Sequence, residues 1–152
     1  VLCWLYKHKA YYNEKWRISK GGGPLGINLV HDLDMICYLL GSIKYVQAFT
    51  SNSVRKFKVE DTATINLVLK SGALCTLNIS DTIVAPWSYE LTAGENPAYP
   101  KTNQSAYFIG GTKGSLQFPN LNSWYYKSER SWWKKIFDKK YNIKFKSIFW
   151  FK

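Results

Sequence analysis

The residues best suited to chemistry gather in one segment, GGGPLGINLVHDLDMICYLLG, which spans residues 21–41. His31 lies ten residues after the first glycine, with Asn28 three residues before it and Asp32 and Asp34 just behind it. Imidazole exchanges protons near neutral pH, so a histidine beside a hydroxyl can take its proton as the carbon is oxidised. A nearby aspartate can orient the imidazole and stabilise its charged form. The segment therefore indicates a site of proton transfer.

A helix is expected to position this polar group. Apolar residues recur at steps of three and four after the glycines, and Gly41 follows the last of them. This pattern predicts a helix that begins at Ile27 or Asn28 and stops at the glycine. Asn28, His31 and Asp34 follow one another at steps of three, so we expect them to share a helix face.

Structural interpretations compete with these chemical ones. A histidine such as His31 can simply be part of the packing, and Asp32 can complement the helix dipole. Residues 21–23 lack Cβ atoms, so another backbone segment or a flat ligand can approach them closely. If a flat ligand is what approaches them, Gly22 and Gly23 are candidates for close contact with a cofactor.

The polar and aromatic stretch 8–20 precedes the glycines and holds four further candidates for substrate binding: Lys9, Tyr12, Trp16 and Arg17. Aromatic faces suit the C–H surfaces of sugars, and Lys and Arg donate hydrogen bonds to hydroxyls. Core packing is the alternative for Trp16. Weaker candidates flank or form a long loop with two prolines: Trp87, Glu95 and Asn96.

Beyond the helix the apolar period changes to two, which is typical of strands. Strands are expected at residues 1–7, 44–52, 62–69, 73–79, 88–92, 107–109 and 115–118. One helix among hairpin-connected strands predicts an α+β fold, with a mostly antiparallel, open-faced sheet and the helix packed on one face. Thr, Asn and Val occupy the other side of strand 62–69, which suits a homo-oligomer formed through the open face.

The composition excludes several classes of protein. The chain has 152 residues, of which 46% are hydrophobic, and no apolar run approaches the ~20 residues that span a bilayer. No signal peptide is recognised. Three widely spaced cysteines fit a reducing, cytoplasmic protein better than a disulfide framework or a metal site. The chain lacks an initial Met and opens on a strand-like run, so we expect a piece of a longer protein.

Positive charge is concentrated near the end of the chain. Residues 127–152 hold nine of the 21 Lys and Arg residues and two acids. Such a segment can attract nucleic acid or an anionic membrane surface. Because it has neither a clean helical stripe nor an RNA-binding signature, we predict no nucleic-acid and no membrane partner. We expect one domain over residues 1–133 and a basic, aromatic tail over 134–152.

Several segments, taken in order over residues 1–133, resemble the C-terminal domain of the Gfo/Idh/MocA oxidoreductases. They are YYNEKWRISK with the glycine–histidine segment, VEDTATINLVLKSGALCTLNISDT, PWSYELTAGENPAYP and IGGTKGSLQFPNL. In that family the first helix opens with Gly-Gly-Gly and a His follows about ten residues later, as from Gly21 to His31. The resemblance implies an NAD(P)-dependent dehydrogenase acting on a sugar or polyol hydroxyl, with His31 as the acid/base residue.

Two departures from the family pattern qualify this interpretation. Many relatives carry an Asp four residues before the His, where this chain has Ile27, so Asn28 becomes the candidate hydrogen-bonding partner of the substrate. The GxGxxG fingerprint and the Glu-Lys-Pro motif are missing. NAD or NADP is therefore expected to bind mainly to a domain absent from this chain. The alternative is a non-enzymatic carbohydrate-binding or oligomerisation module of the same fold.

Overall fold

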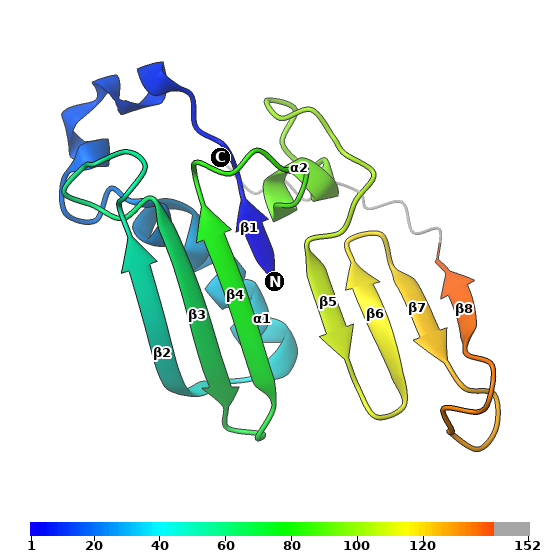
Figure 1. Cartoon of the computed structure of the whole chain (residues 1–152). Helices are drawn as coiled ribbons and strands as arrows, with labels where there is room; N and C mark the ends of the chain where they lie inside the picture. Colours follow the sequence, from blue (N-terminus) through cyan, green and yellow to red (C-terminus); the bar gives the residue numbers. More distant parts are fainter. Residues whose placement is uncertain (142–152) are drawn as a thin grey trace. The chain divides into compact units, whose positions relative to one another are not determined.

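The chain divides into two compact units, Val1–Ser88 and a second unit that begins at Tyr89. The computed structural model in Figure 1 describes residues 1–141. In the first unit four strands form a sheet in the order β1-β4-β3-β2, in which only β1 and β4 pair in parallel. The strands are β1 (Leu2–Trp4), β2 (Ile43–Ser51), β3 (Thr62–Leu69) and β4 (Leu74–Ser80). The predicted α+β fold with a mostly antiparallel sheet is confirmed.

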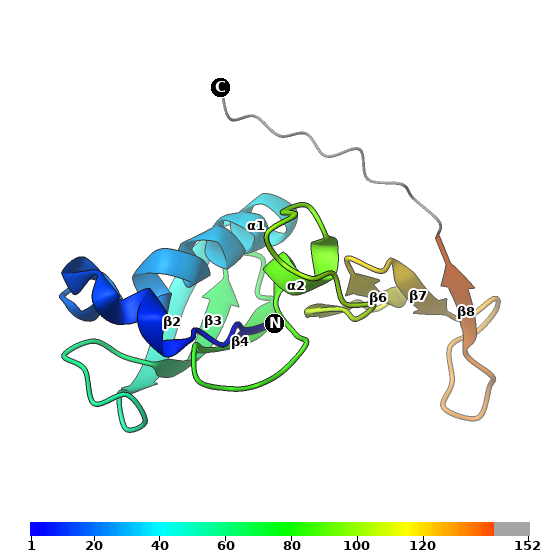
Figure 2. The same cartoon turned by 90° about the horizontal axis from the view of Figure 1, so that it is seen from above.

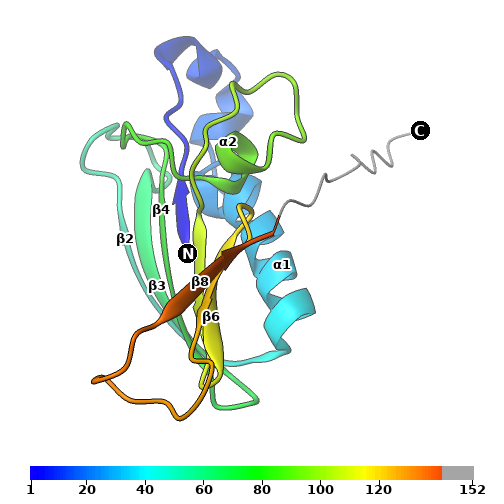
Figure 3. The ribbon, with the colours of Figure 1, turned by 90° about the vertical axis from the view of Figure 1, so that its right-hand side faces the viewer.

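Helix α1 (Val30–Leu40) lies over one face of this sheet (Figures 2 and 3). It is preceded without a break by a π-helical turn, Leu25–Leu29, so the helical region begins earlier than the sequence pattern predicted. Pro24, with φ −60°, occupies the N-cap position of that turn, where its fixed φ suits a helix start. Gly41 ends the helix with φ +92°, as predicted, because glycine adopts this conformation without steric cost.

Alternation along β3 separates the core from the open face. Ala63, Ile65, Leu67 and Leu69 are buried, while Thr64 and Asn66 are exposed. Leu77, Ile79 and Ile36 complete the buried layer from β4 and α1. Full burial of one such Leu or Ile contributes about 1.5–3 kcal/mol, so this layer is what fixes the helix on the sheet.

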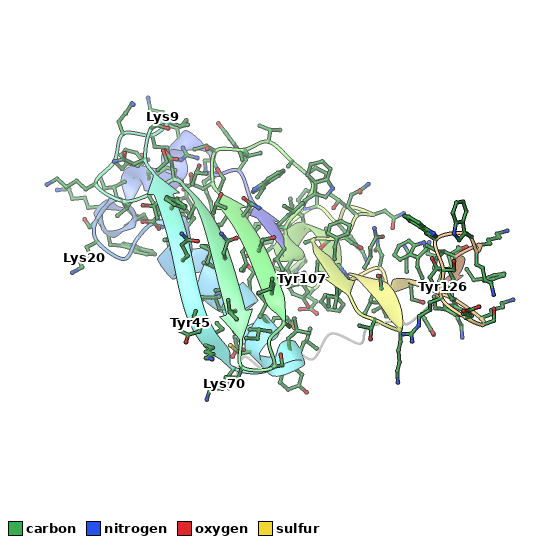
Figure 4. The ribbon with its side chains drawn as sticks, turned by 60° about the horizontal axis from the view of Figure 1, so that its bottom comes forward. Lys9, Lys20, Tyr45, Lys70, Tyr107 and Tyr126 are labelled. Carbon is green, nitrogen blue, oxygen red and sulfur yellow. The ribbon has the colours of Figure 1, made fainter. Side chains whose placement is uncertain are left out.

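The opposite face of the sheet is open. Register pairs Phe49 with Thr64 and Thr64 with Asn78, so these three side chains stand on the same side of neighbouring strands. Figure 4 shows this face with its side chains and labels Tyr45 on β2. Tyr45, Phe49 and Leu74 are large apolar or aromatic residues, and all three are exposed. A semi-polar, open sheet face is therefore present where it was predicted.

The second unit contains a short helix and a four-stranded antiparallel sheet in the order β5-β6-β7-β8. Its elements are α2 (Tyr89–Ala93), β5 (Tyr107–Gly110), β6 (Gly114–Phe118), β7 (Asn122–Tyr125) and β8 (Phe137–Lys140). The strand predicted at 88–92 is wrong, because this segment is helical. Five residues are too few for the apolar period to distinguish the two structures.

Strands β7 and β8 were not predicted, and β8 lies inside the segment that was expected to be a tail. Residues 142–152 of that segment lie outside the described residues. Within residues 1–141 the helices are too short or too polar to cross a bilayer.

The glycines before α1 are packed against the chain's own atoms. The Gly22 amide donates to the Ser19 carbonyl at 2.8 Å, and a Cβ at Gly22 would collide with the backbone of Trp16 and Arg17. A Cβ at Gly23 would collide with the Glu60 carboxylate. These contacts hold the start of the helical region against two other segments.

We predict that Gly22→Ala lowers the free energy of unfolding by about 1–3 kcal/mol, because backbone atoms of another turn occupy the space of the new methyl group. Urea unfolding followed by circular dichroism measures the change. Gly110→Ala is the matched control, since a Cβ there meets nothing within 4 Å. Equal effects of the two substitutions would contradict the packing argument.

Candidate functional site

His31, the predicted acid/base residue, is the second residue of α1 and is exposed. Asp34, further along the helix, is exposed as well, whereas Asn28 and Asp32 are buried. The expected shared face of Asn28, His31 and Asp34 is therefore split. Asn28, Asp32 and Ile36 are buried at steps of four, so Asn28 continues the covered face of the helix, whereas His31 and Asp34 lie on the side that faces solvent.

The stretch before the glycines forms two 3₁₀ turns, Lys9–Asn13 and Lys15–Ile18. Here the Arg17 guanidinium lies 3.9 Å from the centre of the Tyr11 ring, and its Nη1 donates to the Tyr11 carbonyl at 2.7 Å. The ammonium group of Lys7 lies 4.6 Å from the centre of the same ring. Cation–π contacts of this kind stabilise a stack of cationic and aromatic side chains.

The four predicted binding residues of this stretch differ in how far their side chains are exposed to solvent. Trp16 is 54% exposed, so core packing does not account for it. Lys9 is exposed, Arg17 is half-buried, and Tyr12 is half-buried by its contacts with neighbouring segments. Exposed aromatic and cationic groups on adjacent turns can offer both a flat apolar face and hydrogen-bond donors to a polyhydroxylated molecule.

Tyr12 belongs to a polar network centred on Asp81, at the end of β4. The Tyr12 hydroxyl donates to one carboxylate oxygen of Asp81, and Arg55 Nε donates to the other at 2.6 Å. Arg55 also donates through Nη2 to the carbonyls of Lys7, at 2.8 Å, and of Asp81. The network fastens the 3₁₀ turns to the sheet and to the loop that contains Arg55.

The loop around Arg55 is itself held by a second buried acid, Asp61. Its Oδ2 accepts hydrogen bonds from the backbone amides of Val54 at 3.0 Å and Arg55 at 2.9 Å. Neither Arg55 nor the two aspartates were singled out in the sequence. They are 6 to 26 positions apart along the chain, and no local spacing pattern connects them.

A hollow of about 410 Å³ lies beside the glycine segment. It is lined by Lys20 and Gly21, by the end of β2 and by residues 58–60. None of the predicted site residues lines it, and sequence reasoning did not anticipate it. It is made by the loop between β2 and β3 folding back toward residue 20, a contact with no sequence signature.

Three weaker candidates of the sequence analysis have packing partners. Trp87 stands edge-on to Trp4 with ring centres 5.8 Å apart, and its carbonyl accepts the Trp4 amide at 2.9 Å. In the second unit Glu95 accepts the Tyr89 hydroxyl at 2.7 Å, and Asn96 accepts the Ala98 amide at 2.9 Å. Each of these three residues therefore has a structural contact within its own unit.

The space beside Gly22 and Gly23 is filled by the chain's own atoms. Gly22 and Gly23 are buried, and the close approach that they permit is made by Trp16, Arg17 and Glu60. The glycines also follow a 3₁₀ turn, whereas a phosphate-binding loop connects a strand to a helix. Of the two interpretations of the glycine run, the packing one is what the structure displays.

Burial, together with the hydrogen bond to the Asp81 carboxylate, raises the pKa of the Tyr12 phenol well above its usual value. An unfolded tyrosine loses its proton near pH 10, at about its ordinary pKa. Folded Tyr12 keeps its proton there, so the unfolded state binds fewer protons than the folded state. Stability from this group is therefore complete below pH 10 and declines as the pH rises above it.

We predict that the wild-type chain loses more stability between pH 8 and pH 10.5 than Tyr12→Phe does, as measured by urea unfolding at about these two pH values. Tyr45→Phe, on the open face, is the matched control and is expected to show the wild-type decline. A Tyr12→Phe variant with an unchanged decline would show that the phenol does not titrate differently in the two states.

Comparison with known proteins adds to this geometry. The family model described as the GFO/IDH/MocA C-terminal domain matches residues 2–117. The curated proteins contain no match to the chain. Among solved structures, the WlbA dehydrogenase of Chromobacterium violaceum, in complex with NADH and UDP-GlcNAcA, is 28% identical with a TM-score of 0.59. The alignment covers 77% of this chain and 30% of that one.

Two further structures show the same fold at lower identity. The WlbA dehydrogenase of Bordetella pertussis is 23% identical with a TM-score of 0.57, over 77% of this chain and 33% of that one. Levoglucosan dehydrogenase, in complex with NADH and levoglucosan, is 18% identical with a TM-score of 0.61, over 92% and 38%. The chain thus spans about a third of the length of these dehydrogenases. Since the family model matches most of the chain, the protein belongs to the GFO/IDH/MocA family, as a C-terminal domain.

Proposed function

We propose that this chain is the substrate-binding and catalytic half of an NAD(P)-dependent oxidoreductase that acts on a sugar or polyol hydroxyl. The observation that carries the proposal is His31, an exposed histidine in the first turn of α1. It follows the Gly21–Gly23 run within the region that matches the GFO/IDH/MocA C-terminal domain. The WlbA dehydrogenase of Chromobacterium violaceum is solved with UDP-GlcNAcA and levoglucosan dehydrogenase with levoglucosan, which supports a sugar-type substrate.

In this proposal His31 takes the hydroxyl proton while the carbinol carbon is oxidised. The nicotinamide, when bound, supplies the hydride acceptor. Gly22 and Gly23 are packed against the chain's own atoms, and the proposal therefore assigns the binding of NAD or NADP mainly to a separate domain. His31 is exposed, so a substrate hydroxyl can come within hydrogen-bond distance of its imidazole.

Substrate binding is proposed for the residues of the two 3₁₀ turns and for polar residues of the helical segment. Trp16 supplies an exposed ring, and Lys9 and Arg17 supply cationic donors. Tyr12 holds the first 3₁₀ turn in place through its hydrogen bond to Asp81. Asp34 is an exposed hydrogen-bond acceptor on α1. Asn28 is 7% exposed, so a direct hydrogen bond to the substrate would use the small part of its side chain that reaches the surface.

We predict that His31→Ala lowers turnover of the assembled enzyme, with its nucleotide-binding domain present, by about a hundredfold or more, because a general base contributes that much to proton transfer. Oxidation of the polyol is followed as reduced nicotinamide forms. His8, the other histidine of the chain and also exposed, provides the matched control, and His8→Ala is expected to keep turnover within a few-fold of wild type.

The rival function is a non-enzymatic module of the same fold that binds carbohydrate or a second subunit. Ile27, where many relatives carry Asp, is the feature that favours it. If His31→Ala turns over at the wild-type rate, His31 is not the acid/base residue. If the assembled wild-type protein binds sugar but does not turn it over, the non-enzymatic rival replaces the dehydrogenase proposal.

We also propose that the domain forms a homo-oligomer through the open face of its first sheet, in the cytoplasm. Phe49 is 68% exposed there, among Thr and Asn side chains that bond to one another, such as Thr64 with Asn78 at 2.9 Å. Burial of such a ring against a second copy stabilises the oligomer by about 25 cal/mol for each Å² of apolar area removed from water.

The free thiols of Cys3, Cys37 and Cys75 fit a reducing compartment.

We predict that Phe49→Glu converts the oligomer to a monomer, because a carboxylate placed in the subunit interface loses its hydration without gaining a partner. Light scattering coupled to size-exclusion chromatography measures the mass. Tyr38→Glu is the control, since Tyr38 is 85% exposed on α1, on the covered side of the sheet. Dissociation by both variants, or by neither, would count against the open face as the interface.

A further inference from the structure

Two adjacent tryptophans occupy the tip of the connection between β7 and β8. The Lys134 amide donates to the Ser131 carbonyl at 3.0 Å, which closes a four-residue turn with Trp132 and Trp133 at its centre. The Ser131 hydroxyl also accepts the Trp133 amide at 3.3 Å. The turn leaves Trp132 88% exposed and Trp133 85% exposed. Two large aromatic side chains therefore stand in water at the apex of a defined turn.

The turn is anchored at its base. Arg130 donates to the carbonyl of Thr112, in the turn between β5 and β6, and Lys134 pairs with Glu129 at 3.3 Å. Figure 1 shows this connection, in orange, extending past the end of β7. The ring centres of the two tryptophans lie 5.6 Å apart with an angle of 73° between the rings. The pair is thus held at one place on the unit by contacts that do not use the indole rings.

The segment that carries the pair is rich in cationic side chains. Lys127 and Lys135 lie 4.1 and 5.9 Å from the centre of the Phe137 ring, on the strand side of the turn. Between residues 127 and 140 six Lys and Arg residues face only two acids, and one of these acids, Glu129, is already paired. The surface near the tip therefore combines exposed indole rings with excess positive charge.

This combination matches an anionic lipid surface. Indole rings favour the headgroup region of a bilayer, where an apolar ring and a polar N–H are both accommodated. Each Lys or Arg near an anionic leaflet adds electrostatic attraction. No membrane partner was predicted from the sequence, because the basic segment lacks a clean helical stripe. The folded turn supplies the same two ingredients without a helix.

Other partners fit the surface less well. Protein interfaces are depleted in Lys, which is the main cation around this turn. Single-stranded nucleic acid is held by aromatic rings that stack successive bases, whereas these two rings stand edge to face. We propose that the turn at Trp132 and Trp133 docks the protein peripherally on membranes rich in anionic phospholipid, with the indoles inserted at headgroup depth and the surrounding lysines on the lipid charges.

The test is co-sedimentation of the whole chain with vesicles of phosphatidylcholine alone and of phosphatidylcholine with about 30 mol% phosphatidylserine. We expect binding to the anionic vesicles, weak or no binding to the neutral ones, and loss of binding in about 0.5 M NaCl, where charges are screened. Trp132→Ser/Trp133→Ser is expected to abolish binding, and Lys127→Ala/Lys135→Ala, which leaves the Lys134–Glu129 pair in place, to weaken it about thirtyfold.

Matched controls come from the first unit. Tyr38→Ser removes an aromatic ring that is as exposed as the tryptophans, and Lys44→Ala/Lys70→Ala removes two exposed lysines. Both controls should bind anionic vesicles like wild type, and circular dichroism verifies that every variant is folded. The proposal is overturned if wild type does not prefer anionic vesicles, or if the tryptophan variant binds them unchanged. It is equally overturned if the tryptophans instead prove necessary only for self-association or for binding a single-stranded oligonucleotide.

Discussion

The absence of side chains at Gly22 and Gly23 is the constraint on which the first unit depends. At Gly22 the backbone of Trp16 and Arg17 fills the space of a Cβ, and at Gly23 the Glu60 carboxylate does so. Glu60 then accepts the amide of Leu25 at 3.0 Å, the first residue of the helical region. One short run of glycine therefore brings together the 3₁₀ turns, the loop after β2 and the start of the helix. The exposed position of His31 follows from where that helix starts.

Apolar periodicity was sufficient to predict the layers of this unit. The alternation of Ala63, Ile65 and Leu67 with polar residues identified both the core and the open face, because a half-buried strand must alternate. The three- and four-residue steps up to Gly41 identified α1, because one face of a helix must be buried. These features are local, and a single sequence contains all the information they need.

What was missed depends on contacts between distant residues. Arg55 and Asp81 are 26 positions apart, and their ion pair exists because the loop after β2 folds back over the end of β4. Asn28 is buried while His31 is exposed, because the glycine run sets which face of the helical region is covered by the sheet, and no local spacing in the sequence states this. In the second unit, α2 is too short for its period to be diagnostic, and β8 pairs across a long connection that contains the two exposed tryptophans.

If the glycine run is packed against its own chain and so determines where α1 begins, protons of the packed segments lie in contact. Nuclear Overhauser spectroscopy on the whole, isotopically labelled chain measures these contacts, because it reports proton pairs closer than about 5 Å, little more than the ~3.5–4 Å of van der Waals contact. We expect cross-peaks between the α protons of Gly22 and Arg17 and between the α protons of Gly23 and the γ protons of Glu60. If both cross-peaks are absent while the α1 resonances remain those of a folded helix, the glycine packing does not position the helix.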